Sequence, residues 1–120
     1  MKKKTKVEII SEEGVVVVVF KTASISNANE IGAASKEIKE FIEENHPNRI
    51  IVDFEQVKFF SSQLLGLLLE IRANLKTYDG EVVISAINPQ LYRVFKITNL
   101  DKIFKFFPDR DNAVEALSTN

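Results

Sequence analysis

Residues 49–77 constrain the fold of this chain more than any other segment. RIIVDF has the apolar pattern of a strand buried on both faces, and after a short loop FFSSQ leads into a leucine-rich helix. Two serines, Ser61 and Ser62, are therefore expected where a sheet ends and a helix begins. At a helix start the first backbone N–H groups have no partner within the helix, and the helix dipole presents partial positive charge. A serine here can therefore cap the helix, or the helix start can hold a phosphate group.

Strands and helices alternate along the rest of the chain. Apolar spacing predicts strands at residues 7–10, 15–20, 49–54, 81–86 and 102–106, and helices from about 26 or 27 to 45, 62 to 78, 89 to 96 and from 109 onward. The first two strands form an antiparallel hairpin, and the βα units that follow favour parallel pairing. We therefore expect a single α/β domain over residues 1–120, with a mixed sheet of about four to five strands covered by about four helices.

The composition excludes several classes of protein. The sequence contains no cysteine, which excludes disulfides and thiolate metal sites, and its one histidine, His46, is expected in an exposed loop. A net charge of −1 argues against general binding to nucleic acid. No apolar segment follows the lysines near the start, and the longest apolar run, Gly14 to Phe20, is too short for a membrane span. We expect a soluble, cytoplasmic protein that binds no metal, nucleic acid or membrane, with a solvated basic cluster at Lys2, Lys3, Lys4 and Lys6.

Patterns typical of catalysis are missing from the sequence. No G-x-S-x-G motif surrounds the two serines, and no second histidine is present to act as a base. With only four glycines, the chain has neither a Walker loop nor a dinucleotide fingerprint. We therefore expect a binding protein rather than an enzyme, and no cofactor.

The helix that follows the serines has three faces when residues are spaced at about 100°. Leu65 and Leu69 form a second apolar ridge, which either packs on the neighbouring short helix or is left for a partner. Gly66 is expected on the outward face with Gln63. Glycine in a helix costs roughly 1 kcal/mol of stability relative to alanine, so an exposed glycine is useful only if another molecule must approach the helix backbone closely. The core face is formed by Leu64, Leu67, Leu68, Ile71, Leu75 and Tyr78. The start of this helix is thus a candidate docking surface, whether Ser62 is simply a cap or also a site of modification.

Two segments carry a family resemblance. IIVDFEQVKFFSSQLLGLLLEI resembles the central motif of the STAS domain, the sulfate transporter and anti-sigma factor antagonist family, in which a strand ending in Asp or Asn leads to Asp-Ser-Ser/Thr-Gly-Leu-Gly at a helix start. VVISAINPQLYRVFKITNLDKIF resembles the second signature of that family. The resemblance covers about residues 7–117 and implies the STAS fold.

The resemblance also implies a function. In anti-sigma factor antagonists of this family, the first Ser after the Asp accepts phosphate from a partner that is both anti-sigma factor and GHKL-type serine kinase, and a PP2C-type phosphatase resets the switch. Matching the motif places that acceptor at Ser62, with Ser61 as the less favoured acceptor. The partner-binding surface would comprise Asp53, Ser61, Ser62, Gln63, Leu65, Gly66 and Leu69. The ATP would belong to the kinase.

This sequence departs from the family motif at the acceptor site. Ser61 stands where the family has Asp, Gln63 and Leu64 replace the next two motif residues, and Thr22 to Ile25 replace the family's Gly-Glu-Leu-Asp. The alternatives are therefore a STAS scaffold that is never phosphorylated, or a module that binds a small nucleotide, anion or lipid at the same helix start. A homodimer is also compatible with the sequence.

Overall fold

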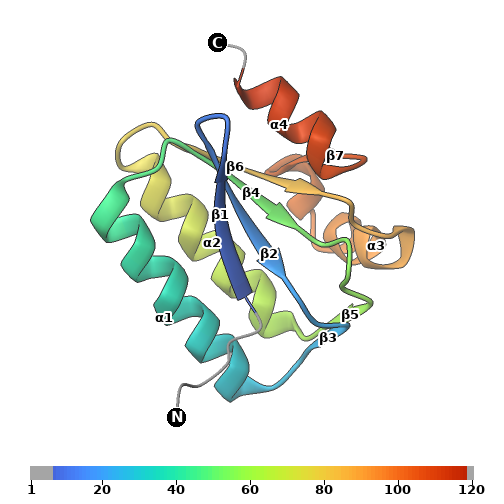
Figure 1. Cartoon of the computed structure of the whole chain (residues 1–120). Coiled ribbons are helices and arrows are strands. Elements are labelled where there is room, and N and C mark those ends of the chain that lie inside the picture. The colour runs from blue at the N-terminus through green and yellow to red at the C-terminus, as the bar shows by residue number, and fades with distance from the viewer. Residues whose placement is uncertain (1–6, 119–120) are drawn as a thin grey trace.

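The computed structural model describes residues 7–118, so the expected basic cluster at the start of the chain lies outside the described residues. A five-stranded sheet has the order β1-β2-β4-β6-β7 (Figure 1). Its strands are β1 (Val7–Glu12), β2 (Val15–Phe20), β4 (Arg49–Asp53), β6 (Glu81–Ser85) and β7 (Lys105–Phe107). Only the β1–β2 pair is antiparallel in this sheet, and the other neighbouring pairs are parallel. The predicted mixed α/β fold is confirmed.

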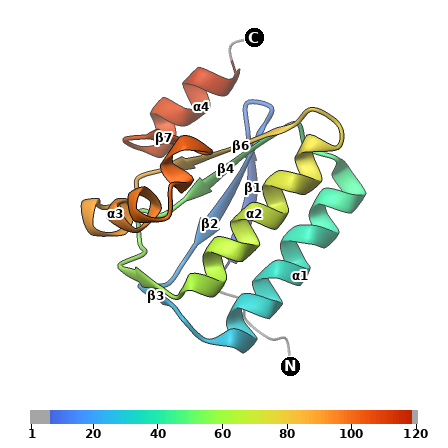
Figure 2. The same ribbon diagram turned by 180° about the vertical axis from the view of Figure 1, so that it is seen from behind.

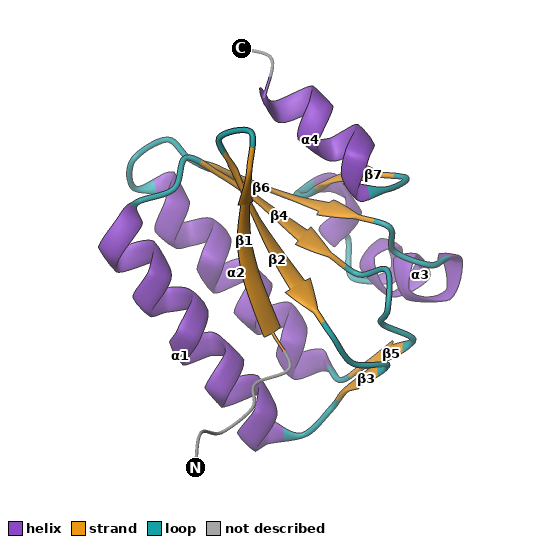
Figure 3. Cartoon of the chain, in the orientation of Figure 1, coloured by secondary structure: helices purple, strands orange, loops and turns teal. Residues whose placement is uncertain are grey.

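Four α-helices cover the sheet in layers. Helices α1 (Ala28–Asn45) and α2 (Ser62–Lys76) pack side by side on one face, and α4 (Arg110–Ser118) packs on the other, as the two opposite views show (Figures 1 and 2). Helix α3 (Pro89–Ile97) and the short 3-10 helix η1 (Leu100–Lys102) lie on the opposite side of the molecule from α1 (Figure 3). The N-terminus of α2 therefore lies between α1 and α3.

Strand β2 shows how the sequence dictates this layering. All six of its residues are buried, as expected for a central strand covered on both faces. Because successive side chains alternate, Val16, Val18 and Phe20 join the core under α1 and α2. The intervening residues Val15, Val17 and Val19 join a smaller core under α4.

Local signals in the sequence fix several element boundaries. The β1–β2 hairpin turns at Glu13 and Gly14, whose positive φ values of 53° and 81° suit a two-residue hairpin turn. Asn27 caps α1 by accepting hydrogen bonds from the N–H groups of Asn29 and Glu30. Asn88 caps α3, with Pro89 as the first helical residue. The predicted starts of α1 and α3 are thus confirmed.

Two expectations about strands were wrong. No strand was predicted between the second strand and the first helix, or between residues 54 and 62, but β3 (Ser24–Ile25) pairs with β5 (Phe59–Phe60) in a separate two-stranded parallel sheet. Strands of two residues have no measurable alternation, so the sequence pattern could not reveal them. The last predicted strand, 102–106, is instead Lys105–Phe107, because the chain leaves α3 through Asn99 at φ 64° and forms η1 first.

None of the helices in residues 7–118 is both long enough and apolar enough to cross a membrane.

Candidate functional site

The small β3–β5 sheet fixes the backbone just before α2. The carbonyl of Ala23 accepts hydrogen bonds from the N–H groups of Lys58 and Phe59, at 2.7 and 3.0 Å. The N–H of Ser61 donates to the carbonyl of Ile25 at 2.9 Å. These bonds tie the loop after β4 to the loop before α1, so the N-termini of α1 and α2 are held beside one another (Figure 2).

The two serines have different environments at the start of α2. Ser61 is the N-cap residue with extended backbone (φ −87°, ψ 164°), yet its side chain makes no capping hydrogen bond. Its Oγ atom is buried with no hydrogen-bond partner among the described residues. Ser62 is the first residue of the helix and is exposed. The interpretation of Ser62 as the cap was therefore wrong, because Ser61 is the N-cap residue and Ser62 is the first, exposed residue of the helix.

An exposed surface surrounds Ser62 on α2. Gln63 and Gly66 are exposed, and the Leu69 side chain is 37% exposed. A Cβ atom added at Gly66 would meet no atom within 4 Å, so the helix backbone is open to close approach there. We call Phe59, Ser62, Gln63, Gly66 and Leu69 the α2 N-terminal surface.

Phe59 belongs to this surface although the sequence analysis did not select it. Its side chain is 54% exposed, whereas that of its neighbour Phe60 is 6% exposed and packs in the main core. The alternation of a strand explains this difference, because consecutive side chains point to opposite faces. An exposed aromatic ring three residues before Ser62 is the type of side chain that often anchors a protein interface. The signal in the sequence was the pair of adjacent phenylalanines before the serines.

A groove between α1 and α2 adjoins this surface. It has a volume of about 450 Å³, and Gln63 and Gly66 line it from α2, opposite Gly32 and Ser35 of α1. An ion pair between Lys39 of α1 and Glu70 of α2 also lies among its lining residues. The exposed arc of α2 is therefore continuous with a groove lined partly by small residues.

Two residues expected on the partner-binding surface are buried instead. Leu65 is 8% exposed and belongs to the main core. Of the two residues in the second apolar ridge of α2, Leu65 is therefore buried and only Leu69 faces solvent. Asp53 is 1% exposed. Its carboxylate accepts a hydrogen bond from Ser85 Oγ at 2.9 Å and lies 3.4 Å from the guanidinium of Arg110. Asp53 therefore joins β4 to β6 and α4, and its burial removes it from any docking surface.

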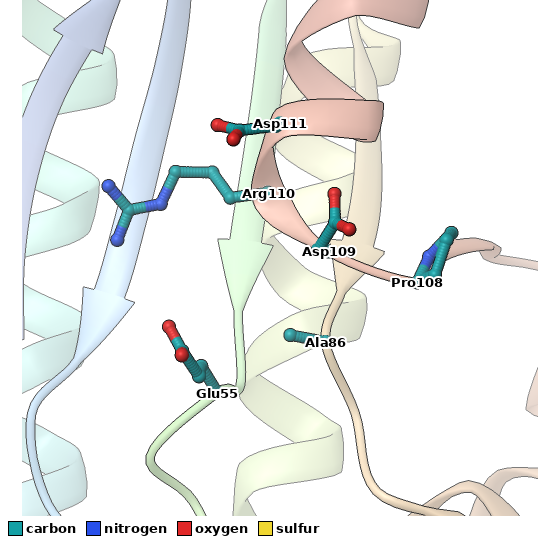
Figure 4. A pocket seen from close by; sticks show the side chains of 6 residues that line it. All are labelled: Glu55, Ala86, Pro108, Asp109, Arg110 and Asp111. Carbon is teal, nitrogen blue, oxygen red and sulfur yellow. The ribbon is translucent and has the colours of Figure 1, made fainter.

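A cavity of about 540 Å³ lies at the carboxyl ends of β4 and β6, lined by Glu55, Ala86, Pro108, Asp109, Arg110 and Asp111 (Figure 4). The Arg110 side chain extends from α4 across β4 towards β2, and its guanidinium pairs with Asp53. Asp109 caps α4 by accepting a hydrogen bond from the N–H of Asn112 at 2.8 Å. Residues 7–118 contain no group of three or more His, Asp or Glu side chains placed to hold a metal ion.

His46 lies far along α1 from the serine site, as an exposed residue at the helix C-terminus with φ 46°. Its ring meets that of Tyr78 edge-on at 5.4 Å. The hydroxyl of Tyr78 donates to the carbonyl of Pro47 at 3.0 Å, and burial raises the pKa of this phenol. These contacts support a structural role for the pair.

The sheet thus positions an exposed serine and an open glycine together at the start of one helix of a small α/β domain. The chain belongs to the STAS domain family, since the family's sequence model matches residues 6–113. Members of this family that act as anti-sigma factor antagonists are regulatory binding proteins, not enzymes.

Known proteins resemble this chain in both sequence and fold. A Bordetella bronchiseptica protein named "Putative anti-sigma factor antagonist BtrV" is 28% identical over 71 residues, covering 59% of this chain and 61% of that protein. An anti-sigma factor antagonist (STAS) domain protein from Planctomyces limnophilus has a TM-score of 0.86 at 19% identity, covering 94% and 98% of the two chains. The phosphorylated form of Bacillus SpoIIAA has a TM-score of 0.73 at 18% identity, covering 92% and 98%. The chain spans about three fifths of the length of the curated relatives it matches.

Proposed function

We propose that this chain is an anti-sigma factor antagonist whose activity is switched by phosphorylation of Ser62. In this proposal the α2 N-terminal surface binds a GHKL-type anti-sigma factor that is also a serine kinase, and thereby frees a sigma factor in the cytoplasm. Phosphorylation of Ser62 weakens that complex, and a PP2C-type phosphatase restores the binding form. The observation that carries the proposal is the exposure of Ser62 as the first residue of α2.

The position of Ser62 suits phosphoryl transfer. Its exposed hydroxyl oxygen would attack the γ-phosphorus of ATP held by the kinase, the bond to the β-phosphate oxygen would break, and ADP would leave. The kinase would supply the base that takes the hydroxyl proton. The neighbouring hydroxyl of Ser61 is buried, which leaves Ser62 as the accessible acceptor of the two.

The same position lets the fold survive modification. Phosphate at the first turn of a helix lies near free N–H groups and the positive end of the dipole, an arrangement that stabilises the helix. The first turn of α2 contains no acidic side chain that would repel the phosphate. The added charge of about −1.5 to −2 would therefore act on the partner, through repulsion and bulk, rather than on the domain itself.

The replacement of the family's Asp by Ser61 changes what a kinase would recognise. The side chain at this position lies within the fold, so it supplies neither charge nor a surface hydrogen bond beside the acceptor. Recognition would then depend on Phe59, Gln63 and the open backbone at Gly66, which are exposed around Ser62.

Co-expression with a GHKL-type serine kinase from the source cell tests the proposal by intact mass. We expect one added phosphoryl group on the unmodified sequence and on Ser61→Ala, but none on Ser62→Ala. Ser61→Ala is the matched control, because it removes the adjacent hydroxyl without altering the exposed one. Absence of the modification, or its persistence in Ser62→Ala, would contradict the assignment of the acceptor. Absence of modification together with partner binding would favour the unphosphorylated scaffold.

A further inference from the structure

Helix α3 has an outer face that the proposed switch does not use. At about 100° per residue, Gln90, Arg93, Lys96 and Ile97 fall within an arc of about 120°. All four are exposed, while Leu91 and Phe95 on the opposite side are buried in the core. The outer face of α3 is thus separate from the apolar face that holds the helix in the fold.

Two isoleucines are exposed in this region. The Ile97 side chain is 74% exposed, the largest exposure among the large apolar residues of the described chain, and Ile103 is 40% exposed. Asn99, in the left-handed conformation, turns the chain from α3 into η1, and η1 packs against α3. The turn therefore brings the segment that carries Ile103 back beside the end of α3. Burial of these side chains in a complex would remove apolar surface from water.

Positive charge accompanies the isoleucines. Residues 89–107 contain four cations, Arg93, Lys96, Lys102 and Lys105, and one acid, Asp101. Lys105 pairs with Glu81 at 3.8 Å, but Arg93, Lys96 and Lys102 are exposed with no ion-pair partner in the described part of the chain. A basic, partly apolar surface thus exists on a chain whose net charge is −1.

We propose that Arg93, Lys96, Ile97, Lys102 and Ile103, here called the α3–η1 surface, form a second docking site. The partner is a protein segment that presents carboxylates around aliphatic side chains, such as an amphipathic acidic helix. Charge complementarity argues for the carboxylates, and the two exposed isoleucines argue for the aliphatic side chains. This site is independent of the phosphorylation of Ser62.

Two other occupants fit the surface less well. The first is a membrane, into which a surface-bound helix inserts a broad apolar face. The apolar face of α3 is not available for this, because Leu91 and Phe95 are buried in the core. A second copy of this chain would offer the outer side of α1, which carries the exposed acids Glu40, Glu43 and Glu44. The exposed large apolar residues of the described chain are Phe59, Leu69, Ile97 and Ile103, none of them on α1, so such a contact would leave the isoleucines without apolar partners.

A synthetic helical peptide with leucines spaced at three and four residues among glutamates provides the probe. Titration of the ¹⁵N-labelled protein at low salt should shift amide signals in residues 90–103. Replacing the leucines by serine, or the glutamates by lysine, gives peptides that should bind at least about fivefold more weakly. Anionic vesicles and sedimentation of the protein alone test the other two occupants.

Variants locate the contact on the protein. Ile97→Ser should weaken binding of the leucine–glutamate peptide about tenfold, and the double variant Lys96→Glu/Lys102→Glu should weaken it at least about fivefold. The matched controls are Leu69→Ser, an exposed apolar residue on α2, and Ser62→Asp, and both should leave the affinity unchanged. The proposal would be overturned if all three peptides bound equally well, or if the amide shifts fell outside residues 90–103. It would also be overturned by tighter binding to vesicles than to the peptide, or by self-association of the protein through these residues. Ser62→Asp alters the α2 N-terminal surface and not the α3–η1 surface. If the proposed α3–η1 docking site proves wrong, the proposed switch at Ser62 is therefore unaffected.

Discussion

Gly66→Ala should stabilise the domain while weakening the proposed partner complex. Glycine within a helix costs more conformational entropy on folding than alanine, and the difference is about 0.5–1 kcal/mol. This gain is fully available only if the new methyl group fits without strain, and an added Cβ at Gly66 meets no atom within 4 Å. We therefore expect the free energy of unfolding to rise by about 0.5–1 kcal/mol and the melting temperature by about 2–5 °C.

Urea denaturation followed by circular dichroism measures this effect, with a higher midpoint and an unchanged slope. Two matched glycines sharpen the test. Gly32→Ala on α1 also meets open space and should stabilise by a similar amount. Gly80→Ala should destabilise by about 1–3 kcal/mol, because its Cβ would lie 3.0 Å from two atoms of Leu75 and 3.1 Å from the carbonyl of Asn48. A Gly66→Ala variant no more stable than the parent would refute the description of an open outer face on α2.

Three further predictions concern the framework. Ser85→Ala should lower the free energy of unfolding by about 2 kcal/mol, because it removes a hydrogen bond to the buried carboxylate of Asp53, and an unchanged urea midpoint would contradict this. Asn88→Ala should cost about 1 kcal/mol, since it removes the cap that accepts from the N–H of Leu91, and helix loss by circular dichroism on heating should occur earlier. Burial raises the pKa of Tyr78, so the unfolded state loses this proton first and stability should fall as pH rises above 10. Tyr78→Phe should reduce that fall, and identical pH profiles for the two proteins would show the reasoning to be wrong.

The main elements could be predicted from sequence because their signals are local. The six-residue apolar run of β2 indicated a strand covered on both faces, and every residue of it is buried. Asn27 and Asn88 are short polar residues placed directly before amphipathic segments, and both cap helices. Local patterns of this kind require no knowledge of which segments meet in space.

The environment of the candidate site could be predicted only in part, because it depends on contacts distant in sequence. A polar residue at a strand end can face solvent or the interior. Asp53 is buried because Ser85 and Arg110, which lie 32 and 57 residues further along the chain, provide its partners. The difference between Ser61 and Ser62 likewise depends on the pairing of β3 with β5, which holds Ser61 against Ile25.

The most direct test of the central claim is the affinity of this chain for the proposed partner, a GHKL-type anti-sigma factor, measured by calorimetry for the parent and for Ser62→Asp. A carboxylate at position 62 adds negative charge at the helix start while the N–H groups and the dipole preserve the fold. We expect binding to weaken at least about tenfold, with circular dichroism and the urea midpoint showing a domain no less stable than the parent. Unchanged affinity in a folded Ser62→Asp protein would contradict the account of Ser62 as a switch on the binding surface.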